Sequence, residues 1–557
     1  MRFFRDEQGS AWRDLAALAV TFGVLFFQFL GRLPLIDPDE GRYVEIPREM
    51  IERGDFVTPM LNYVKYFEKP PLHYWLNALS LTVFGENEFA ARFAGTMCGL
   101  LTVLLTYWLG RQLFGRRSGL YAATLLGTAL GFLVQSRINF TDMTLTFTLS
   151  AAFACFLLAS REDSREKARY YYLFYLFMAL AVLAKGLIGI VLPGGVIFLY
   201  LLATRRWRLL KEMRIPTGTL LFLLVCAPWF VLVSMRNPEF PHFFFIHEHF
   251  QRFLSKVHRR YQPLWFFIPV LIGTMMPWSL FIPAALGKGW RERKAHPEKL
   301  FLFLWAALIF AFFSKSNSKL IPYILPVIPP LAVLMGNWFA EVRDPACVRR
   351  YGMATGLLLI VVGGVALGYP LATTHPIIGT ADGGVIGGLF IVAGIVSGLA
   401  ARSGDQVRLL ASLAASAYVL AVVAPPLIYD HIADYTSAKG LSRAIEQYGG
   451  KDAKIACLGD YQQGIAFYTH RRVILVGERD ELDFGSRQGD NSGWFVDPRD
   501  FMKTWNSGEK VFMVVKKNDL PSLKLCSQVP VQVLFEAGER LLVANHPVAG
   551  PGPQSAK

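Results

Sequence analysis

Charged side chains are scarce in this sequence of 557 residues. Asp, Glu, Lys and Arg make up 18% of the chain, whereas hydrophobic residues make up 53% and the mean hydropathy is +0.35. Soluble domains carry about 25% charged residues, so this composition argues against a soluble protein. Apolar stretches of about twenty residues, the length of a membrane-spanning helix, recur from Ala16 to Ile428. We therefore predict a polytopic α-helical membrane protein.

Several signals of other protein classes are missing as well. The sequence holds no internal repeat and no glycine-rich phosphate loop, and the glycine-rich run 383–394 is better explained by close helix packing. No cleavable signal is evident, because the polar N-terminus is followed by a full-length span that we expect to be retained. Only two of the six cysteines, Cys457 and Cys526, lie in the polar tail. They could pair if that tail is extracytoplasmic, and the sequence leaves this open.

The basic residues follow the expected membrane topology. The net charge is +15, but Lys and Arg cluster in short loops between apolar stretches, which the positive-inside rule and anionic lipids explain without a nucleic-acid partner. The basic loops are 111–117, 160–169, 204–214, 288–294 and 349–350. They broadly fall on the side of the N-terminus, which is therefore expected to be cytoplasmic. The loops expected on the outer side are 36–88, 236–262, 314–319 and 373–383.

We predict about thirteen membrane-spanning helices from the length that a bilayer requires. Their expected ranges are 14–31, 89–110, 117–136, 140–159, 170–184, 186–203, 216–235, 263–286, 299–314, 320–340, 351–372, 384–401 and 407–428. An odd number of spans places the C-terminus on the outer side. From about Tyr429 short β-rich runs alternate with turns and a helical stretch. Residues 1–428 are therefore expected to form the transmembrane domain, with outer loops at 32–88 and 236–262, and residues 429–557 a small outer α/β domain with a disordered tail.

The stretch Ile36–Trp75, between the first two spans, is dense in charge. That density excludes it from hydrocarbon, and its Tyr, Phe, Trp and Pro content does not fit a flexible linker. We interpret it as the core of an active site at the membrane surface. Asp39 and Glu40 could bind a cation, position a cationic substrate or act as a base. They could equally be the cap and the first-turn acids of a helix.

The end of this stretch carries a second group of charges. Pro70 and Pro71 force an extended approach to the next helix, which would fix Glu68 and Lys69 as a rigid pair, with Tyr66 and Phe67 in the membrane interface. An aromatic belt with snorkelling lysines is the alternative. It explains the aromatic residues well and the double proline badly.

Further ionisable residues lie at the expected outer ends of later spans. Asp142 could pair with Arg137 or serve as a site carboxylate. Lys185, between two apolar runs, could reach an anion or snorkel to the interface. Lys319 and Tyr323 lie at the expected outer end of another span.

The outer loop 242–262 is rich in histidine and arginine. It holds His247, Glu248, His249, Arg252, His258, Arg259 and Arg260. No HExxH spacing is present, so the signal for a metal is weak, and the arginines suit a phosphate better. An amphipathic helix lying on the headgroups is the alternative.

These motifs resemble those of a known family. The stretch DPDEGRYVEIPREMIERGDFVTPMLNYVKYFEKPPLHYWLNAL (37–79) looks like the first outer loop of bacterial members of the ArnT-like/protein O-mannosyltransferase superfamily. ARFAGTMCGLL, FTDMTLTF, LAKGLIGIVLPG, EHFQRF and KLIPYILPVIPP resemble later blocks of that family in the expected order. The resemblance covers about residues 10–340 and does not extend to the C-terminal domain. YFEKPP is similar to the aminoarabinose transferase branch.

The resemblance implies a GT-C membrane glycosyltransferase that acts on the periplasmic side of the bacterial inner membrane. Enzymes of the aminoarabinose branch move 4-amino-4-deoxy-L-arabinose from undecaprenyl phosphate to a lipid A phosphate, with inversion, and confer resistance to polymyxin and cationic peptides. The expected partners are the undecaprenyl phosphate-linked sugar donor, the lipid A acceptor and membrane lipids. We expect a monomer without an organic cofactor.

Such a reaction must hold two phosphates close together and stabilise the leaving phosphate. The expected ligands of the donor phosphate are Lys69, Arg252, Lys185, Tyr323 and Arg260. By resemblance, Asp39 is the key carboxylate, and the other expected catalytic residues are Asp142, Arg42 and Glu40. Glu68 and His249 could bind a divalent metal ion.

Three alternatives stay open at this point. A sister branch could transfer a hexose or a uronic acid to lipid A core, or could glycosylate protein. A lipid-sugar flippase would also be polytopic, but it needs polar residues along a path through the membrane, whereas these residues are expected on one face. A binding or scaffold subunit is the third alternative.

Overall fold

The computed structural model describes residues 9–251, 262–373, 378–449, 452–548 and 554–555. Contacts divide the chain into two compact units. The first comprises Met1–Leu30 and Phe93–Leu427, and the second comprises Gly31–Arg92 and Ile428–Lys557. The charged outer loop therefore groups with the C-terminal residues. The expected division into 1–428 and 429–557 stays a prediction about domains.

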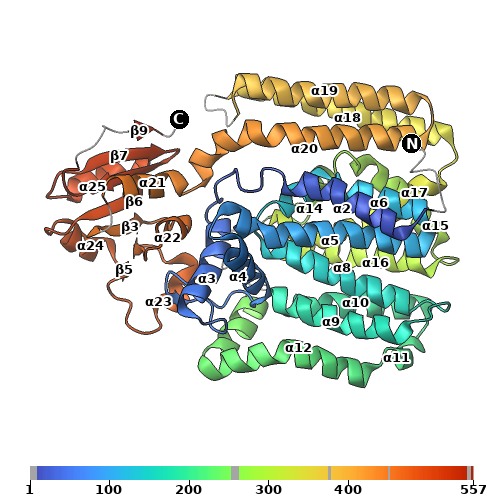
Figure 1. Cartoon of the computed structure of the whole chain (residues 1–557), viewed down its shortest axis with the longest axis horizontal. Coiled ribbons are helices and arrows are strands. Elements are labelled where there is room, and N and C mark those ends of the chain that lie inside the picture. Colours follow the sequence, from blue (N-terminus) through green and yellow to red (C-terminus); the bar gives the residue numbers. More distant parts are fainter. Residues whose placement is uncertain (1–8, 252–261, 374–377, 450–451, 549–553, 556–557) are drawn as a thin grey trace. The chain divides into compact units, whose positions relative to one another are not determined.

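Helices make up the first unit (Figure 1). Those wholly or mostly within it are α2 (Ala11–Phe27), α5 (Glu88–Phe114), α6 (Arg116–Gly127), α7 (Leu130–Ser136), α8 (Thr141–Ala159), α9 (Lys167–Lys185), α10 (Ile188–Thr204), α11 (Leu209–Glu212), α12 (Ile215–Arg236), η1 (His242–Gln251), α14 (Phe267–Thr274), η2 (Ser279–Phe281), α15 (Ile282–Glu292), α16 (Pro297–Lys315), η3 (Ile321–Val327), α17 (Ile328–Glu341), α18 (Pro345–Ala372), α19 (Thr380–Arg402) and α20 (Gln406–Thr436).

The prediction of a polytopic helical protein is confirmed. Among the described residues, eight helices are long and apolar enough to cross a membrane, or up to ten if each of two bent pairs forms one span. Every expected span overlaps one of these helices or pairs, or one of α2, α9 and α10, each of which falls short of the required length or hydropathy. Run length thus located the helices, because a bilayer-spanning helix needs about twenty apolar residues.

Two spans expected to be continuous are bent. Ranges 117–136 and 263–286 are each split, with bends of 67° between α6 and α7 and 114° between α14 and the η2–α15 helix. The breaks contact each other. The Leu130 amide donates to the Met276 carbonyl at 2.9 Å, and the Trp278 indole N–H donates to the Thr128 hydroxyl at 3.1 Å. One backbone N–H and one backbone carbonyl at the breaks are therefore satisfied by each other, as hydrocarbon requires.

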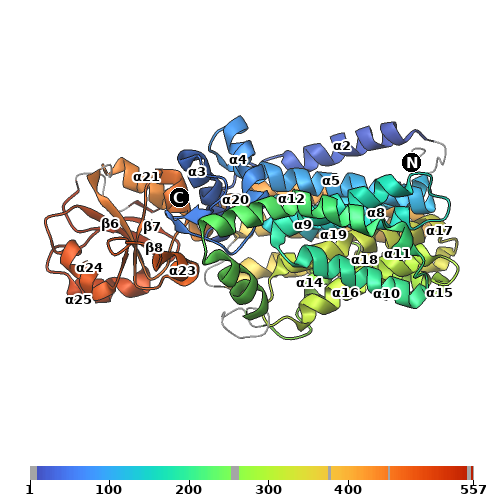
Figure 2. The same cartoon turned by 90° about the horizontal axis from the view of Figure 1, so that it is seen from below.

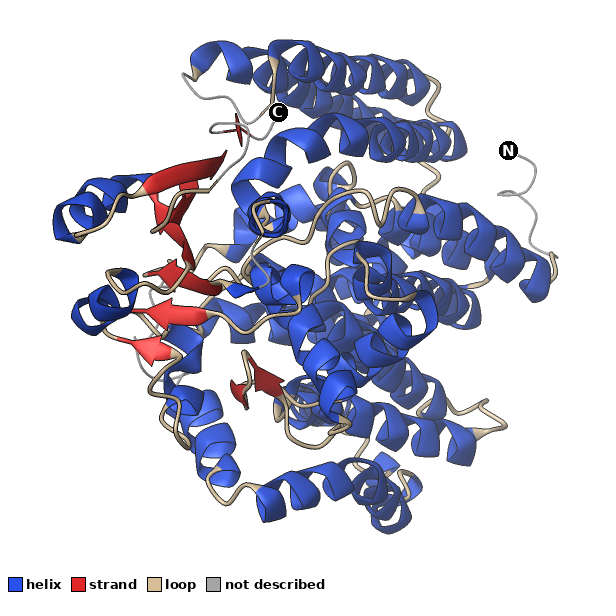
Figure 3. Cartoon of the chain, turned by 60° about the vertical axis from the view of Figure 1, so that its left-hand side comes forward, coloured by secondary structure: helices blue, strands red, loops and turns tan. Residues whose placement is uncertain are grey.

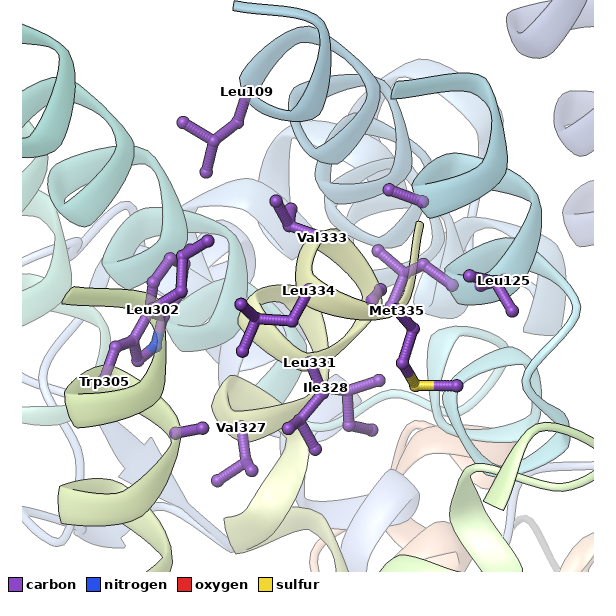
Figure 4. Close-up of a cluster of buried hydrophobic side chains, with 14 of the residues drawn as sticks. Leu109, Leu125, Leu302, Trp305, Val327, Ile328, Leu331, Val333, Leu334 and Met335 are labelled. Carbon is purple, nitrogen blue, oxygen red and sulfur yellow. The ribbon is translucent and has the colours of Figure 1, made fainter. Parts of the chain in front are cut away.

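Helix α17 contributes many buried side chains to the apolar core of the first unit, part of which Figure 4 shows. Leu331 and Leu334 of α17 lie with Leu302 and Trp305 of α16, and all four side chains are buried. On the side of α6, a Cβ at Gly336 would come within 2.6 Å of the Ala122 backbone nitrogen. A small residue is therefore needed where α17 and α6 approach closely.

Helices α18 and α19 pack along their length and lie side by side in Figures 1 and 2. A Cβ at Gly356 would lie 2.7 Å from the carbonyl oxygen of Gly394, and a Cβ at Gly387 would lie 2.7 Å from that of Gly363. The interpretation of the run 383–394 as a close-packing surface is therefore confirmed.

The second unit combines the outer loop with an α/β fold. The outer loop forms α3 (Asp39–Arg53), the hairpin β1 (Met60–Leu61) and β2 (Val64–Lys65), and α4 (Leu72–Phe84). The C-terminal elements are α21 (Lys439–Gln447), β3 (Lys454–Leu458), α22 (Gly464–Thr469), β4 (Ile474–Val476), η5 (Asp480–Leu482), α23 (Asp483–Ser486), β5 (Phe495–Val496), α24 (Pro498–Trp505), β6 (Val511–Lys516), η6 (Lys517–Asp519), α25 (Leu520–Cys526), β7 (Gln532–Ala537), β8 (Arg540–Ala544) and β9 (Gln554–Ser555).

Seven strands form one mixed sheet in the order β5-β4-β3-β6-β8-β7-β9 (Figure 3). Strand β3 runs parallel to β4 and β6, whereas β8 runs antiparallel to β6 and β7. Phe501 and Trp505 of α24 pack against one face of the sheet, and α21 contacts β7 and β8. Cys457 and Cys526 are free thiols, the first buried in β3 and the second exposed. The predicted disordered tail falls largely on residues 549–553 and 556–557, which lie outside the described residues.

Candidate active site

Helix α3 places Asp39 at the start of the charged loop. Pro38 occupies the N-cap without a side-chain cap bond, and Asp39 and Glu40 are the first-turn acids. Asp39 is therefore not the cap that the sequence allowed, and its carboxylate instead meets the positive end of the helix dipole. Gly54, with φ of 63°, ends the helix. The Asp39 side chain is 32% exposed, so it is accessible at the surface of this unit.

Arg42 is the centre of a buried polar network. Its side chain is only 3% exposed. Its Nη2 donates to Oδ1 of Asp39 at 3.1 Å, and its Nε donates to Oε1 of Gln463 at 3.2 Å. Its Nη1 lies 2.7 Å from Oε2 of Glu481 and 3.3 Å from the Tyr66 hydroxyl. A guanidinium held from three sides fixes one oxygen of Asp39 while the rest of that carboxylate stays accessible.

The two C-terminal residues of this network follow parallel strands. Gln463 lies just after β3 and Glu481 just after β4. Carboxyl ends of parallel strands lie at one edge of a sheet, where α/β folds usually place functional side chains. Neither residue was among the sequence candidates. The alternation of β-runs and turns at 454–477 was the available signal, since it marked where those strands end.

Glu40 is placed as a structural residue. Its side chain is buried, and its two oxygens accept from Nε and Nη2 of Arg92 at 2.8 and 2.6 Å. The Ile36 amide also donates to Glu40 at 2.9 Å. Both carboxylate oxygens are therefore engaged within the fold. A catalytic role for Glu40 stays a prediction.

Asp37, next to the site, joins the outer loop to the C-terminal elements. Its carboxylate accepts from the backbone amides of Ala438 at 2.9 Å and Gly464 at 2.6 Å, and its own amide donates to Thr436 at 2.7 Å. Burial raises the pKa of Asp37 to about 6, against the opposing effect of the two amide bonds. Its role was not expected from the sequence, because it depends on contacts about 400 residues away along the chain.

Glu68 and Lys69 lie as a pair between β2 and α4. The Lys69 ammonium donates to the Glu68 carbonyl at 3.0 Å and lies 3.9 Å from Oε2 of Glu68. Burial raises the pKa of Tyr66, an effect that Arg42 opposes and Glu68 reinforces, so both charges lie near this ring. Tyr66 and Phe67 are buried within the protein, and their place at the depth of the membrane interface stays a prediction. The second unit thus brings Asp39, Arg42, Glu68 and Lys69 into one neighbourhood.

The first unit holds a separate cluster. Asp142, in the first turn of α8, forms an ion pair with Lys185, the last residue of α9. The Lys185 ammonium lies 4.5 Å from the centre of the Tyr323 ring. Asp142 is thus paired with Lys185, and Arg137, the partner in one of the two interpretations that the sequence left open, donates to the Gln28 carbonyl. Three of the sequence candidates therefore meet.

Lys319 adds a buried cation to the same unit. Its side chain is 5% exposed, and its ammonium donates to the carbonyls of Gln262 at 2.8 Å and Ser316 at 2.5 Å. Burial lowers its pKa. Two further expected phosphate ligands, Arg252 and Arg260, lie outside the described residues.

Comparison with known proteins identifies the family. Residues 34–244 match the family model of dolichyl-phosphate-mannose-protein mannosyltransferase, and residues 441–545 match that of the aminoarabinose transferase C-terminal domain. An undecaprenyl phosphate-α-4-amino-4-deoxy-L-arabinose arabinosyl transferase of Aeromonas hydrophila is 36% identical over 377 residues, which cover 65% of this chain and 68% of the relative. The chain belongs to this family of arabinosyl transferases.

Solved structures extend the likeness over the whole transferase. The crystal structure of apo ArnT from Cupriavidus metallidurans is 30% identical, has a TM-score of 0.85, and covers 98% of this chain and 100% of that one. The structure of the same protein bound to undecaprenyl phosphate is 31% identical, with a TM-score of 0.85 and coverage of 97% and 100%. The GT-C fold is confirmed. The expected limit of the resemblance near residue 340 is wrong, because the likeness includes the C-terminal domain.

A metal site in the transferase stays a proposal. Within the described ranges, no group of three or more His, Cys, Asp or Glu side chains could hold a metal ion. The side chain of His249 lies outside what is described, and Glu68 has the Lys69 ammonium nearby. Glu248, which precedes His249 in η1, has its Oε1 3.6 Å from Nδ1 of His247.

Proposed function

We propose that this transferase moves 4-amino-4-deoxy-L-arabinose to a lipid A phosphate on the periplasmic face of the bacterial inner membrane. It is a membrane glycosyltransferase that uses an undecaprenyl phosphate-linked donor, as its relatives' names and the ArnT structure with undecaprenyl phosphate support. The observation that carries the proposal is the Asp39–Arg42 pair, an accessible carboxylate fixed by a buried network in a chain matched by ArnT along its length. We further propose a monomer that needs no organic cofactor.

The chemistry needs positioning more than a strong base. At neutral pH the acceptor phosphate is already ionised, so one of its oxygens can attack the anomeric carbon directly. The bond from that carbon to the donor phosphate oxygen breaks, undecaprenyl phosphate leaves, and the configuration inverts. The main barrier is the approach of two anions and the charge on the leaving phosphate, which fixed cations lower.

Roles follow for the residues of the second unit. Lys69 lies at a fixed position before the double proline, and we assign it to the donor phosphate. Arg252 and Arg260, which belong to the first unit, stay proposed phosphate ligands. Asp39 faces the developing positive charge of the sugar or its amino group. Arg42 keeps that carboxylate in place through the bond from its Nη2.

Roles for the first unit rest on its own cluster. The Asp142–Lys185 pair beside Tyr323 presents one acid, one cation and one phenol together. We propose that Lys185 and Tyr323 bind phosphate and that Asp142 orients Lys185. Glu68, in the second unit, and His249, in the first, stay proposed metal ligands. A divalent ion would neutralise phosphate charge, and no step above depends on it.

Lipid A from cells with and without the protein tests the proposal. Mass spectrometry should show the increment of aminoarabinose only when the protein is present, together with polymyxin resistance. A hexose or uronic acid increment would assign the sister branch instead. Purified protein in detergent should form product from donor and lipid A. A flippase would not form product, because it only moves its substrate from one side of a membrane to the other.

Topology is tested separately. The periplasmic placement predicts that a reporter active only in the periplasm works when fused at Lys557, because basic loops and an odd number of spans put the tail outside. Activity of a reporter that works only in the cytoplasm, fused at the same residue, would contradict the periplasmic placement.

A further inference from the structure

A cavity of about 380 Å³ lies between α5, α8 and α9 of the first unit. Its walls are apolar and aromatic, with Trp108 from α5, Ala151 and Cys155 from α8, and Tyr170 from α9. Neither Asp142 nor Lys185 lines it, and Cys155, near the end of α8, and Arg169, near the start of α9, lie far from those two residues along the helices. No step of the proposed reaction uses it.

The cavity is polar at one end and apolar at the other. Arg169 and Tyr170, in the first turn of α9, line the polar end, where the Trp108 and Tyr170 rings lie 6.0 Å apart. Phe147 and Phe177 make an edge-to-face contact at 6.0 Å two turns deeper. From Arg169 to Phe177 the helix rises roughly 12 Å, at 1.5 Å per residue. A ligand that fits must therefore join an apolar chain to a polar or anionic head.

The charge at the mouth selects an anion. Arg169 is 69% exposed, and its pair with Glu166 at 3.0 Å is a surface pair of the kind that contributes little. A phosphate can compete for such a guanidinium, which binds phosphate oxygens two at a time. The adjoining loop 160–169 is one of the basic loops assigned to the cytoplasmic side, where anionic lipids concentrate.

We propose that this cavity binds an anionic phospholipid of the cytoplasmic leaflet. One acyl chain occupies the space beside Ala151 and Cys155, and the phosphate lies at Arg169, with Trp108 and Tyr170 at the depth of the headgroups. The lipid would fasten α5 to α8 and α9. The assignment of the leaflet rests on the topology proposed above, whereas the cavity and its charge do not.

Native mass spectrometry of the full-length protein tests the site, with phosphatidylglycerol and phosphatidylcholine of identical chains as probes. The wild type should retain one phosphatidylglycerol in preference to phosphatidylcholine. Ala151→Phe, which fills the cavity, should lower that retention about tenfold or more. Arg169→Gln should remove the preference for phosphatidylglycerol and keep weak binding of both lipids. The matched control is Arg208→Gln, because Arg208 is a 90% exposed arginine that also lies near a helix glutamate, and it should change nothing.

A second measurement needs no cavity-filling variant. Phosphatidylglycerol with brominated chains should quench part of the tryptophan fluorescence, and Trp108→Phe should remove that part. Equal retention of both lipids by the wild type, or unchanged retention in Ala151→Phe, would overturn the proposal. Quenching that does not depend on Trp108 would also overturn it, as would displacement of the lipid by undecaprenyl phosphate, which would make the cavity a donor site.

Discussion

A substitution of Glu40 distinguishes a structural role of this carboxylate from a catalytic one. Its side chain and that of Arg92 are 0% and 2% exposed, and two hydrogen bonds of 2.8 and 2.6 Å join them. Breaking a buried ion pair by changing one partner costs about 3–5 kcal/mol, because the other charge is left without compensation. We therefore predict that Glu40→Gln destabilises the second unit.

The size of the effect follows from the contacts that remain. Arg92 keeps its bonds to the carbonyls of Leu33 at 2.6 Å and Pro34 at 3.0 Å, and Gln can still accept one bond. The cost should therefore lie near 3 kcal/mol, the lower end of the range. For a unit of 150–250 residues this lowers Tm by roughly 6–12 °C, at about 2–4 °C per kcal/mol.

Thermal unfolding in detergent, measured beside transfer of the sugar, checks this prediction. Glu40→Gln that still folds at the assay temperature should retain most of its turnover. In a double-mutant cycle, Arg92→Gln should cost less in the Glu40→Gln background than in the wild type, because the pair is already broken. An unchanged Tm with abolished transfer would refute the reasoning and return Glu40 to the catalytic set.

Three further predictions follow from the same unit. Burial raises the pKa of Asp37 from 3.8 to about 6, so the folded state binds this proton more tightly than the unfolded state does. The free energy of unfolding should therefore fall by about 3 kcal/mol as pH rises from about 4 to above 6, at about 1.36 kcal/mol per pKa unit. Tm measured against pH should show this slope in the wild type and not in Asp37→Asn. Lys69→Ala should weaken binding of undecaprenyl phosphate roughly 10- to 100-fold, as expected for a charge-assisted hydrogen bond of about 1.5–3 kcal/mol, and Lys69→Arg should restore it only in part; unchanged affinity would reject the assignment. Glu481→Gln should lower kcat roughly 10- to 100-fold with donor affinity unchanged, because the substitution loosens Arg42 and so misplaces Asp39. A similar loss of kcat in Gln463→Leu would support the network around Arg42, and normal kcat in both variants would exclude its role in transfer.

The sequence located what depends on local composition. Runs of apolar residues predicted the helices, and the density of charge in Ile36–Trp75 predicted a polar site there, because both follow from the cost of placing groups in hydrocarbon. Asp142 and Lys185 were found for the same reason. Their mutual pairing was not predicted, because nothing in the sequence indicates a contact between residues 43 positions apart.

What the sequence missed depends on tertiary contacts. The sequence did not show that Glu40 pairs with Arg92, 52 residues away. Gln463 and Glu481 are polar residues in an ordinary α/β pattern, and only the fold brings them to Arg42. The bends at 127–130 and 274–279 likewise depend on hydrogen bonds between two separate helix breaks.

The central claim is that Asp39 acts in the transfer step. Asp39→Asn keeps the size of the side chain and one oxygen for Arg42, and as a first-turn residue Asp39 contributes only about 0.3–1 kcal/mol to the helix. Loss of an electrostatic catalytic group typically lowers the rate about 100-fold or more. The decisive measurement is single-turnover transfer by purified Asp39→Asn at saturating donor, beside donor affinity and Tm. The account predicts a normal Tm, normal donor affinity and a rate lowered about 100-fold or more. Near-normal transfer in Asp39→Asn would contradict it.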